Sequence, residues 1–354
     1  MMPASANSTR LGTSGSTTVT SPLVATTRAT MRAVIQTAYG DSDVFRSSEL
    51  ERPVPGDGEV LVEVRAAGLD RGTWHLMTGR PYLMRIMGFG FSRPNHPVPG
   101  LDVAGVVVDV GAGVTRFSVG DEVFGIGKGS FAEFSVARED KLAHKPALLS
   151  FVEAAVLGVS GLTAWQAVCV DGRVASGQRV LIVGASGGVG SHAVQIAKAQ
   201  GAVVTGVCSA AKADFVRSLG ADHVLDHSRD DFADGSTRYD VVIDIGGGST
   251  LARLRRALTD HGTAVLVGSE NDGNIVGGMM LKAFASFLLS PFVPQSFRMC
   301  MSREHFSGLE ELARLVDRGV LVPRVDRTFT LGEVQAAMRL LEAGEVRGKV
   351  AITP

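Results

Sequence analysis

Cysteine is scarce in this chain of 354 residues. The three cysteines, Cys169, Cys208 and Cys300, lie far apart, which argues against a disulfide-built scaffold and leaves too few thiols for a structural zinc site with four cysteine ligands. Neither sign of charge is in excess, because 35 lysines and arginines stand against 36 acidic residues. This balance, without any long basic run, argues against a nucleic-acid partner.

Long apolar runs are also absent. The most apolar stretch, residues 277–293, is interrupted by Lys282, two serines and Pro291, so it is too short and broken to span a bilayer. We therefore expect a buried or subunit-facing helix there and no membrane span. The whole chain is 45% hydrophobic and 20% charged, which is typical of a globular protein, and its length suggests two domains.

The first thirty residues differ from the rest of the chain. They hold thirteen serines and threonines, two arginines and no acid, with no sustained hydrophobic periodicity. Such a segment has little to bury, so we expect residues 1–30 to form a disordered tail of a cytoplasmic protein, with Met31 as the working start. The alternative is a transit peptide, which would make the protein organellar.

Glycine is abundant, and one glycine cluster is the most informative feature. The apolar residues 180–183 predict a buried strand, and a glycine-rich turn and an apolar helix over residues 191–199 follow it directly. Glycines permit a tight turn and let backbone N–H groups approach a diphosphate at the positive end of the helix. A second strand, 203–207, completes a βαβ unit, which favours this reading over a merely structural turn. The pattern predicts a dinucleotide cradle formed by Gly184, Ser186, Gly187, Gly188, Val189 and Gly190.

The end of the second strand indicates which dinucleotide is bound. An NAD site usually places an acid there, whereas this chain continues with Ser209 and then Lys212. Ser209 can donate a hydrogen bond to a 2′-phosphate and Lys212 offers positive charge, so the sequence favours NADPH over NADH. The alternative is that Lys212 is a solvated lysine at a helix start.

The order of predicted elements divides the chain into two domains. Alternating strands punctuated by glycine and proline predict a mostly β catalytic domain over residues 31–156. Strands and helices then alternate over residues 157–290, as in a doubly wound nucleotide-binding domain. Residues 291–354 are predicted to return to the catalytic domain, beginning with a possible edge strand of the nucleotide domain. The expected fold is therefore α/β, with a parallel Rossmann sheet inserted into a mostly β domain and a substrate cleft between them.

Four motifs in fixed order connect these domains to a known family. They are residues 100–105 (GLDVAG), 120–123 (GDEV), 218–222 (SLGAD) and 347–350 (RGKV), beside the glycine turn. With these motifs the chain resembles the medium-chain dehydrogenase/reductase superfamily, in its zinc-independent quinone oxidoreductase branch. The resemblance covers residues 31–354. It implies a GroES-like β domain, an inserted Rossmann domain, an interdomain active site and a homodimer joined through the nucleotide domains.

The resemblance also indicates that no metal is bound. Zinc alcohol dehydrogenases of the superfamily carry a cysteine and a histidine ligand where this chain has Asp70 and Leu101. His75, His96 and Asp102 remain as candidate ligands, but their spacing is not diagnostic of a site. A metal-free site suits quinones and α,β-unsaturated carbonyls, because conjugation spreads the negative charge that develops during hydride transfer.

The resemblance further suggests catalytic residues. Tyr82 lies near a tyrosine of related quinone and enoyl reductases, so its phenol is expected to direct a hydrogen bond to the substrate oxygen. Packing in its loop is the alternative role. Asp70 stands where many relatives carry asparagine and is expected to face the nicotinamide or its ribose, with a loop cap as the alternative.

Other expected cofactor contacts come from the resemblance alone. Thr163 should approach the nicotinamide ribose, and the turn containing Gly246 and Gly247 should back the nicotinamide. Lys349 should reach the cofactor phosphates, and His227 occupies a position often held by tyrosine near the adenine. A surface position for Lys349 and a packing role for His227 are the alternatives.

The resulting functional prediction is an NADPH-dependent reductase of quinones or α,β-unsaturated carbonyls. A carbonyl reductase or alcohol dehydrogenase for simple aldehydes and ketones is the first alternative. A non-catalytic NADPH-binding scaffold is the second, since a fold alone does not establish turnover.

Overall fold

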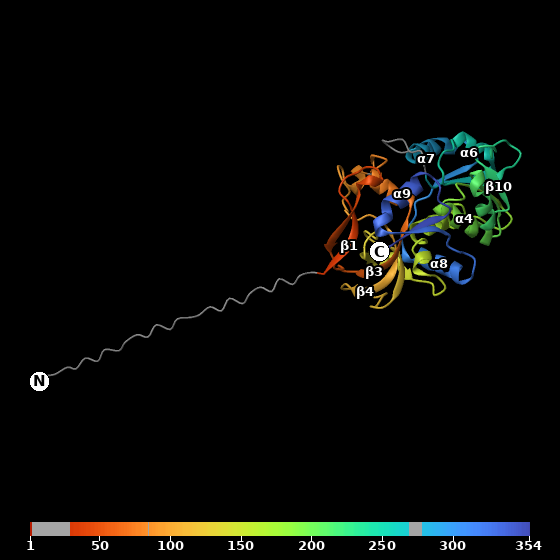
Figure 1. Cartoon of the computed structure of the whole chain (residues 1–354). Helices are drawn as coiled ribbons and strands as arrows, with labels where there is room; N and C mark the ends of the chain where they lie inside the picture. Colours follow the sequence, from red (N-terminus) through yellow and green to blue (C-terminus); the bar gives the residue numbers. More distant parts are fainter. Residues whose placement is uncertain (2–28, 84, 269–277) are drawn as a thin grey trace.

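The computed structural model describes residue 1 and residues 29–83, 85–268 and 278–354. The predicted tail therefore lies, except for residues 1, 29 and 30, outside the described residues. In Figure 1 the first strands and the last strand of the chain form one domain, and the middle of the chain forms a second domain beside it. The fold class predicted from the sequence is confirmed.

The sheet of the first domain is built around the long strand β3 (Glu59–Leu69), whose apolar side chains Val60, Val62 and Val64 are buried. β3 pairs antiparallel with β4 along one edge, while β6 and β15 share its other edge. The strand order is β14-β15-β3-β4-β5-β7. The bounds are β4 (Asp102–Val110), β5 (Glu122–Ile126), β6 (Phe134–Arg138), β7 (Leu142–His144), β14 (Val325–Thr330) and β15 (Lys349–Thr353).

A separate hairpin-like pair, β1 (Thr30–Gln36) and β2 (Phe45–Glu51), packs beside this sheet. The sequence of β2, FRSSELE, has little apolar alternation. It pairs antiparallel with β1 in a register that places Val34 opposite Ser47. Helices α1 (Arg71–Thr78), α2 (Phe151–Ala154) and α9 (Val334–Glu342) complete the domain.

The second domain is a parallel sheet of six strands in the order β10-β9-β8-β11-β12-β13. Its central strands are mostly apolar because helices cover both faces. The order reverses direction between β8 and β11, which makes their carboxyl ends the switch point where such folds bind ligands. The strands are β8 (Arg179–Val183), β9 (Val203–Cys208), β10 (His223–Asp226), β11 (Tyr239–Asp244), β12 (Leu258–Leu266) and β13 (Ser296–Met299).

Helices α3 (Gly158–Trp165), α4 (Gly188–Ala199), α5 (Ala213–Ser218), α6 (Leu251–Ala257), α7 (Gly278–Leu289) and α8 (Phe306–Asp317) belong to this half of the chain. α7 packs near β13 but presents apolar side chains to solvent, with Leu281 60%, Phe284 65% and Phe287 75% exposed. The expectation that this helix is buried is therefore wrong for the face that carries these three side chains. The alternative, that this face contacts another subunit, stays a prediction. Among the described residues, no helix is both long and apolar enough to cross a membrane.

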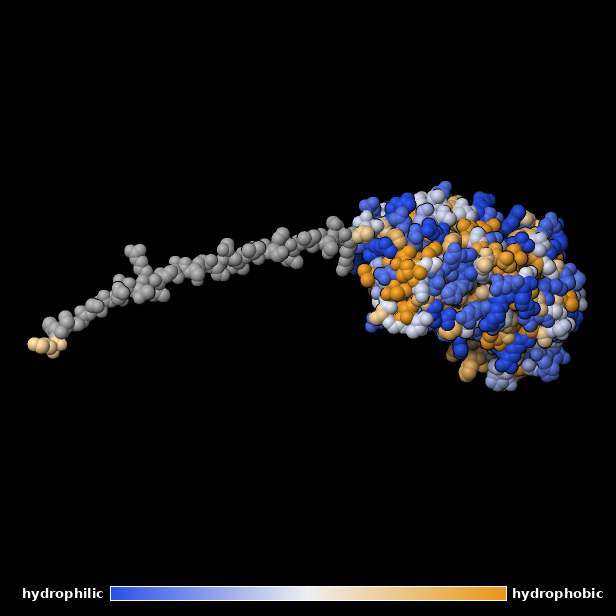
Figure 2. All heavy atoms as spheres, turned by 90° about the horizontal axis from the view of Figure 1, so that it is seen from below, coloured by the Kyte–Doolittle hydropathy of each residue, from blue (hydrophilic) through white to orange (hydrophobic). Residues whose placement is uncertain are grey.

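The molecular surface seen from below is mixed (Figure 2). Hydrophilic areas alternate with smaller hydrophobic patches, as on most globular proteins, where apolar atoms supply much of the exposed area. The chain leaves the second domain after β13 and α8 and re-enters the first sheet as β14 and β15. The last strand thereby reaches the boundary between the domains, where the glycine turn also lies.

Candidate active site

The glycine turn after β8 has the geometry that a diphosphate cradle requires. Gly184 has φ +89°, a conformation that side chains with a Cβ rarely adopt. A Cβ on Gly190 would collide with the carbonyl oxygen of Gly184, so only glycine allows the first turn of α4 to pack this closely against the end of β8. Gly187 is the residue before the first turn of α4 and has extended backbone, which directs the N–H groups of that turn out of the helix end.

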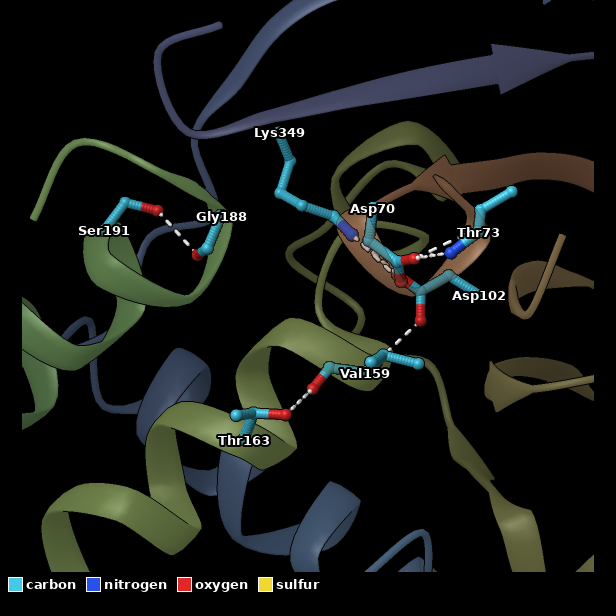
Figure 3. Close-up of polar contacts among 8 residues, drawn as sticks. All are labelled: Asp70, Thr73, Asp102, Val159, Thr163, Gly188, Ser191 and Lys349. Atoms are coloured by element: carbon cyan, nitrogen blue, oxygen red, sulfur yellow. Dashed lines mark hydrogen bonds and ion pairs between the residues drawn. The ribbon is translucent and has the colours of Figure 1, made fainter. Parts of the chain in front are cut away.

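The structure brings the six predicted cradle residues together. Ser186 is 8% exposed, and its carbonyl oxygen accepts a hydrogen bond of 2.8 Å from the backbone N–H of Gly348. Ser191 Oγ donates to the carbonyl oxygen of Gly188 at 3.0 Å, inside the first turn of α4 (Figure 3). A Cβ on Gly188 would lie 2.7 Å from Lys349 Cδ, so the last strand touches the cradle.

A second glycine turn meets the first at the switch point. The backbone N–H groups of Ile245 and Gly246 both donate to the carbonyl oxygen of Val183, at 3.0 and 3.2 Å. A Cβ on Gly184 would lie 3.2 Å from the nitrogen of Gly246, whereas one on Gly248 would meet nothing within 4 Å. The two turns are thus in contact, and the position beside Gly248 is open, at the carboxyl ends of β8 and β11 where such folds bind a dinucleotide.

The second turn is held by two charged side chains. Asp244, at the end of β11, accepts a hydrogen bond of 3.1 Å from the N–H of Gly247. Lys282 of α7 donates through Nζ to the carbonyl oxygen of Gly247 and lies 3.6 Å from Asp244 Oδ2. Burial raises the pKa of Asp244, and the Lys282 ammonium opposes that rise. The sequence prediction used Lys282 only as a break in an apolar run, although a lone cation in an apolar helix was a usable signal.

A buried cluster of charges lies on the other side of the cradle (Figure 3). Lys349 Nζ donates to Asp102 Oδ2 at 2.9 Å and lies 3.7 Å from Asp70 Oδ2, and the three side chains are 2%, 0% and 5% exposed. Burial raises the pKa of Asp102 to about 6; the Lys349 ammonium opposes this rise, and the Asp70 charge adds to it. Burial alone would lower the pKa of Lys349, but the two carboxylates outweigh it and raise that pKa.

In the structure Lys349 is buried, so the alternative of a surface position is wrong. Its ammonium lies between two carboxylates, and its predicted contact with the cofactor phosphates stays a prediction. The physical reason is charge compensation, since two buried carboxylates without a cation would be far more costly than one satisfied ion cluster. The aliphatic part of Lys349, rather than its charge, faces the glycine turn.

Asp70 fulfils the alternative role of a loop cap. Its Oδ1 accepts hydrogen bonds from Thr73 N at 2.8 Å and from Thr73 Oγ1 at 3.1 Å, so it is the N-cap of α1. Among the described residues, Asp70 Oδ2 has no hydrogen-bond partner and makes only the longer contact with Lys349. Its predicted contact with nicotinamide or ribose stays a prediction.

Asp102 also ties the cluster to α3. Its Oδ1 accepts a hydrogen bond of 2.6 Å from the N–H of Val159 in the first turn of that helix. One turn later, Thr163 Oγ1 donates to the carbonyl oxygen of Val159 at 2.7 Å (Figure 3). Thr163 is therefore positioned by a helix whose start is fixed by the charge cluster, and its predicted contact with the ribose is untested.

At the other end of the predicted cofactor site, Ser209 follows β9 and Lys212 lies one turn further on. Lys212 Nζ donates to the carbonyl oxygens of Gly344 and Val346, at 2.6 and 2.7 Å, so its ammonium is engaged by the last segment of the chain. Arg347 from the same segment donates to the carbonyl oxygen of Ala211 at 3.4 Å. Arg347 was in a quoted motif but received no role, because the sequence does not show which loop it meets.

His227 is joined to the same region by its backbone, since its N–H donates to the carbonyl oxygen of Cys208 at 3.0 Å. Its imidazole is exposed at the end of β10, beside the predicted adenine end of the site. Cys169 and Cys300 are poor nucleophiles, because burial raises the pKa of each thiol to about 12.

Tyr82 is the least connected of the predicted residues. Its side chain is 40% exposed, and the guanidinium of Arg85 lies 4.7 Å from its ring centre. Arg85 lies at 4.2 Å over Tyr39 as well, so the three side chains form a stacked group. This arrangement agrees with the packing role, and the donor role stays a prediction. Within the described ranges, no group of three or more histidine, cysteine, aspartate or glutamate side chains could hold a metal ion.

Comparisons with known proteins agree with this architecture. Residues 56–147 match the model of the alcohol dehydrogenase GroES-like domain, and residues 219–352 match that of the zinc-binding dehydrogenase family. The chloroplastic quinone-oxidoreductase QR1 of Triphysaria versicolor is 32% identical over 340 residues, covering 92% of this chain and 98% of the relative. The mitochondrial NAD(P)H oxidoreductase RTN4IP1 of Bos taurus is 31% identical over 363 residues, covering 91% and 89%. The 2-methylene-furan-3-one reductase of Solanum lycopersicum is 31% identical over 343 residues, covering 92% and 79%.

Solved structures share the fold at slightly lower sequence identity. The quinone oxidoreductase from Coxiella burnetii superposes with a TM-score of 0.81 at 28% identity, covering 92% of this chain and all of that chain (100%). Mycobacterial Rv1454c, solved with NADPH, gives a TM-score of 0.79 at 27% identity, with coverage of 92% and 100%. The predicted family is therefore confirmed. The chain belongs to the zinc-independent quinone oxidoreductase branch of the medium-chain dehydrogenase/reductase superfamily and is an oxidoreductase that uses a nicotinamide cofactor.

Proposed function

We propose that this protein is an NADPH-dependent reductase of quinones or α,β-unsaturated carbonyls. The observation that carries the proposal is the contact between the turns at Gly184 and Gly246 at the switch point of the sheet, where folds of this kind bind a dinucleotide. When bound, the reduced nicotinamide supplies the hydride. The chain's own contribution is to bind and orient the cofactor through the glycine turn, the N–H groups at the start of α4 and the turn after β11.

The preference for NADPH rests on charge at the end of β9. No acid directly follows Cys208; the chain continues with Ser209 and then Lys212, and Arg347 contacts the carbonyl oxygen of Ala211 between them. Two cations beside the Ala211 loop would attract a 2′-phosphate, whereas an acid would bind a ribose hydroxyl and repel the phosphate. Lys212 must exchange its two carbonyl partners for the phosphate, and Arg347 is near enough to share that role.

The acceptor class rests on the side chains available to polarise a carbonyl. We propose a metal-free site because Asp70 and Leu101 stand where zinc-dependent relatives have ligands. The Lys349 ammonium is engaged by two carboxylates and is not directed to a substrate. Conjugated carbonyls need least polarisation, and Tyr82 is the proposed oxygen-directed donor for them. The names of the quinone oxidoreductase and furanone reductase relatives support the same substrate class.

Two further proposals come from the family and its named relatives. We propose a homodimer joined through the nucleotide domains, with the apolar face of α7 as part of the subunit contact. The chloroplastic and mitochondrial relatives support the organellar alternative for residues 1–30 over a cytoplasmic location.

The test is NADPH oxidation with a quinone, an α,β-unsaturated ketone and a saturated ketone in parallel, with EDTA present throughout. We expect turnover of the first two and little of the third. Lys212→Ala should weaken NADPH binding by about 10- to 100-fold, because it removes a charge-assisted hydrogen bond, and should leave NADH binding unchanged. Preference for the saturated ketone would support the carbonyl reductase alternative, and cofactor binding without turnover of any acceptor would support the scaffold.

A further inference from the structure

We infer that Lys282 of α7 is a positioning residue of the dinucleotide site, acting through the turn at Gly247. The inference rests on the cofactor site proposed above and extends it to a helix outside every motif of the sequence. Lys282 donates to the carbonyl oxygen of Gly247, while Asp244 accepts from its N–H. The two peptide planes that flank Gly247 are therefore each fixed by a charged side chain.

The turn needs this support because of its conformation. Gly247 has φ +66°, and neighbouring Gly248 has no atom within 4 Å of the position a Cβ would occupy. A turn of three successive glycines has no side chains to restrict it, and glycine has the greatest backbone freedom of any residue. The hydrogen bonds to Lys282 and Asp244 restrict that freedom at the switch point of the sheet.

The charges explain why Lys282 stays at this position. Asp244 is 1% exposed, and within the described part of the chain its Oδ2 has no hydrogen-bond partner, only the Lys282 ammonium at 3.6 Å. Lys282 is 20% exposed, so its ammonium remains near water while it neutralises a buried carboxylate. A buried carboxylate that lost this cation would be left uncompensated.

α7 exposes apolar side chains and directs its charged side chain inward, which is the opposite of an ordinary surface helix. Its sequence GMMLKAFASFLL carries one charged residue, and that residue points inward to the end of β11 while Leu281, Phe284 and Phe287 are exposed. A surface helix usually buries its apolar face and exposes its charges. The inward lysine is thus not explained by the packing of α7, and its contacts with the turn give it a role at the site.

The experiment measures NADPH affinity of the full-length protein by fluorescence titration, with thermal unfolding recorded for each variant. We expect Lys282→Met to raise the Kd for NADPH about tenfold, and Lys282→Arg to restore most of the affinity. In steady-state assays KM for NADPH should rise while kcat changes little, because the lysine does not touch the reacting atoms. The matched control is Lys198→Met, which removes a lysine from a surface pair with Asp222 at 2.7 Å.

The double variant Asp244→Asn/Lys282→Met separates positioning from charge compensation. It leaves no uncompensated buried charge, and the amide oxygen that replaces the carboxylate can still accept from the Gly247 N–H. We expect it to regain thermal stability while its Kd for NADPH stays raised. Recovery of the wild-type Kd would overturn the inference, because Lys282 would then only neutralise Asp244, and an unchanged Kd in Lys282→Met would overturn it as well. A wild-type chain that binds neither NADPH nor NADH would instead overturn the proposed function itself.

Discussion

Each domain holds a lysine–aspartate pair with a buried carboxylate: Lys349–Asp102 in the first domain and Lys282–Asp244 in the nucleotide domain. The two pairs differ in how completely the carboxylate is hydrogen-bonded. In the first domain both oxygens of Asp102 accept hydrogen bonds, from Val159 N at 2.6 Å and Lys349 Nζ at 2.9 Å. In the nucleotide domain Asp244 accepts one hydrogen bond, and its second oxygen lies 3.6 Å from Lys282.

The difference follows from where the two pairs lie. Lys349 is 2% exposed and joins β15 to β3 and β4, so its pair is a closed structural connection. Lys282 is 20% exposed and lies at the end of β11, beside the crevice. The Lys282–Asp244 pair is therefore more accessible to solvent than the Lys349–Asp102 pair, and it holds the glycine turn of the proposed cofactor site.

Removal of Lys349 should have the largest effect on stability. Lys349→Met leaves Asp102 and Asp70 buried without a cation, so we expect the free energy of unfolding to fall by roughly 3–5 kcal/mol. Denaturant unfolding at pH 7 measures this change. A loss of less than about 1 kcal/mol would mean that water reaches the carboxylates, and the description of a closed pair would be wrong.

Lys282→Met should cost less stability than Lys349→Met. One buried carboxylate loses its cation, but the lysine is partly solvated in the native protein, so we expect a loss of about 1–3 kcal/mol. The same unfolding experiment gives the value. An equal loss in the two variants would remove the distinction between the closed and the open pair.

The pH dependence of Asp102 sharpens the comparison further. Its folded pKa of about 6 lies above the unfolded value of about 3.9, so the native state binds the extra proton between these values. The stability of the wild type relative to Asp102→Asn should therefore be greatest near pH 4 and decline as the pH rises to about 6, then stay level. Unfolding curves of both proteins from pH 4 to 8 test this, and a difference that increases with pH would contradict the assignment.

The exposed pair Lys198–Asp222 should show the smallest effect. Its side chains are 31% and 36% exposed, and we expect Lys198→Met to change the free energy of unfolding by about 0–1 kcal/mol. If Lys198→Met lowered the free energy of unfolding as much as Lys282→Met does, solvent exposure would not determine how much these ion pairs contribute to stability.

Local features of the site were predictable from sequence. The apolar residues 180–183 correspond to β8, and the glycine turn and the next strand follow as expected, because each depends on neighbouring residues. The helix begins at Gly188, three residues earlier than predicted, because the glycines that form the cradle are also the first turn of α4. The fold class followed from the same local patterns taken in order.

Side-chain destinations were not predictable, because they depend on partners distant in sequence. Lys349 meets Asp102 across 247 positions, and Lys212 meets Gly344 across 132. The local sequence does not distinguish a buried ammonium from a solvated one, so it did not show that Lys349 lies between two carboxylates. Lys282 was missed for the same reason, since only the fold brings α7 to the end of β11.

The pairing of β15 with β3 sets an order for events during synthesis. Asp102 is made 247 residues before Lys349, which at about 5–20 residues per second is a delay of roughly ten seconds to a minute. During that interval the carboxylates of the first domain lack their cation, and β3 lacks its partner strand at residues 67–69. The nucleotide domain, made in between from contiguous sequence, is therefore free to fold first, and the first domain closes on it when β15 arrives.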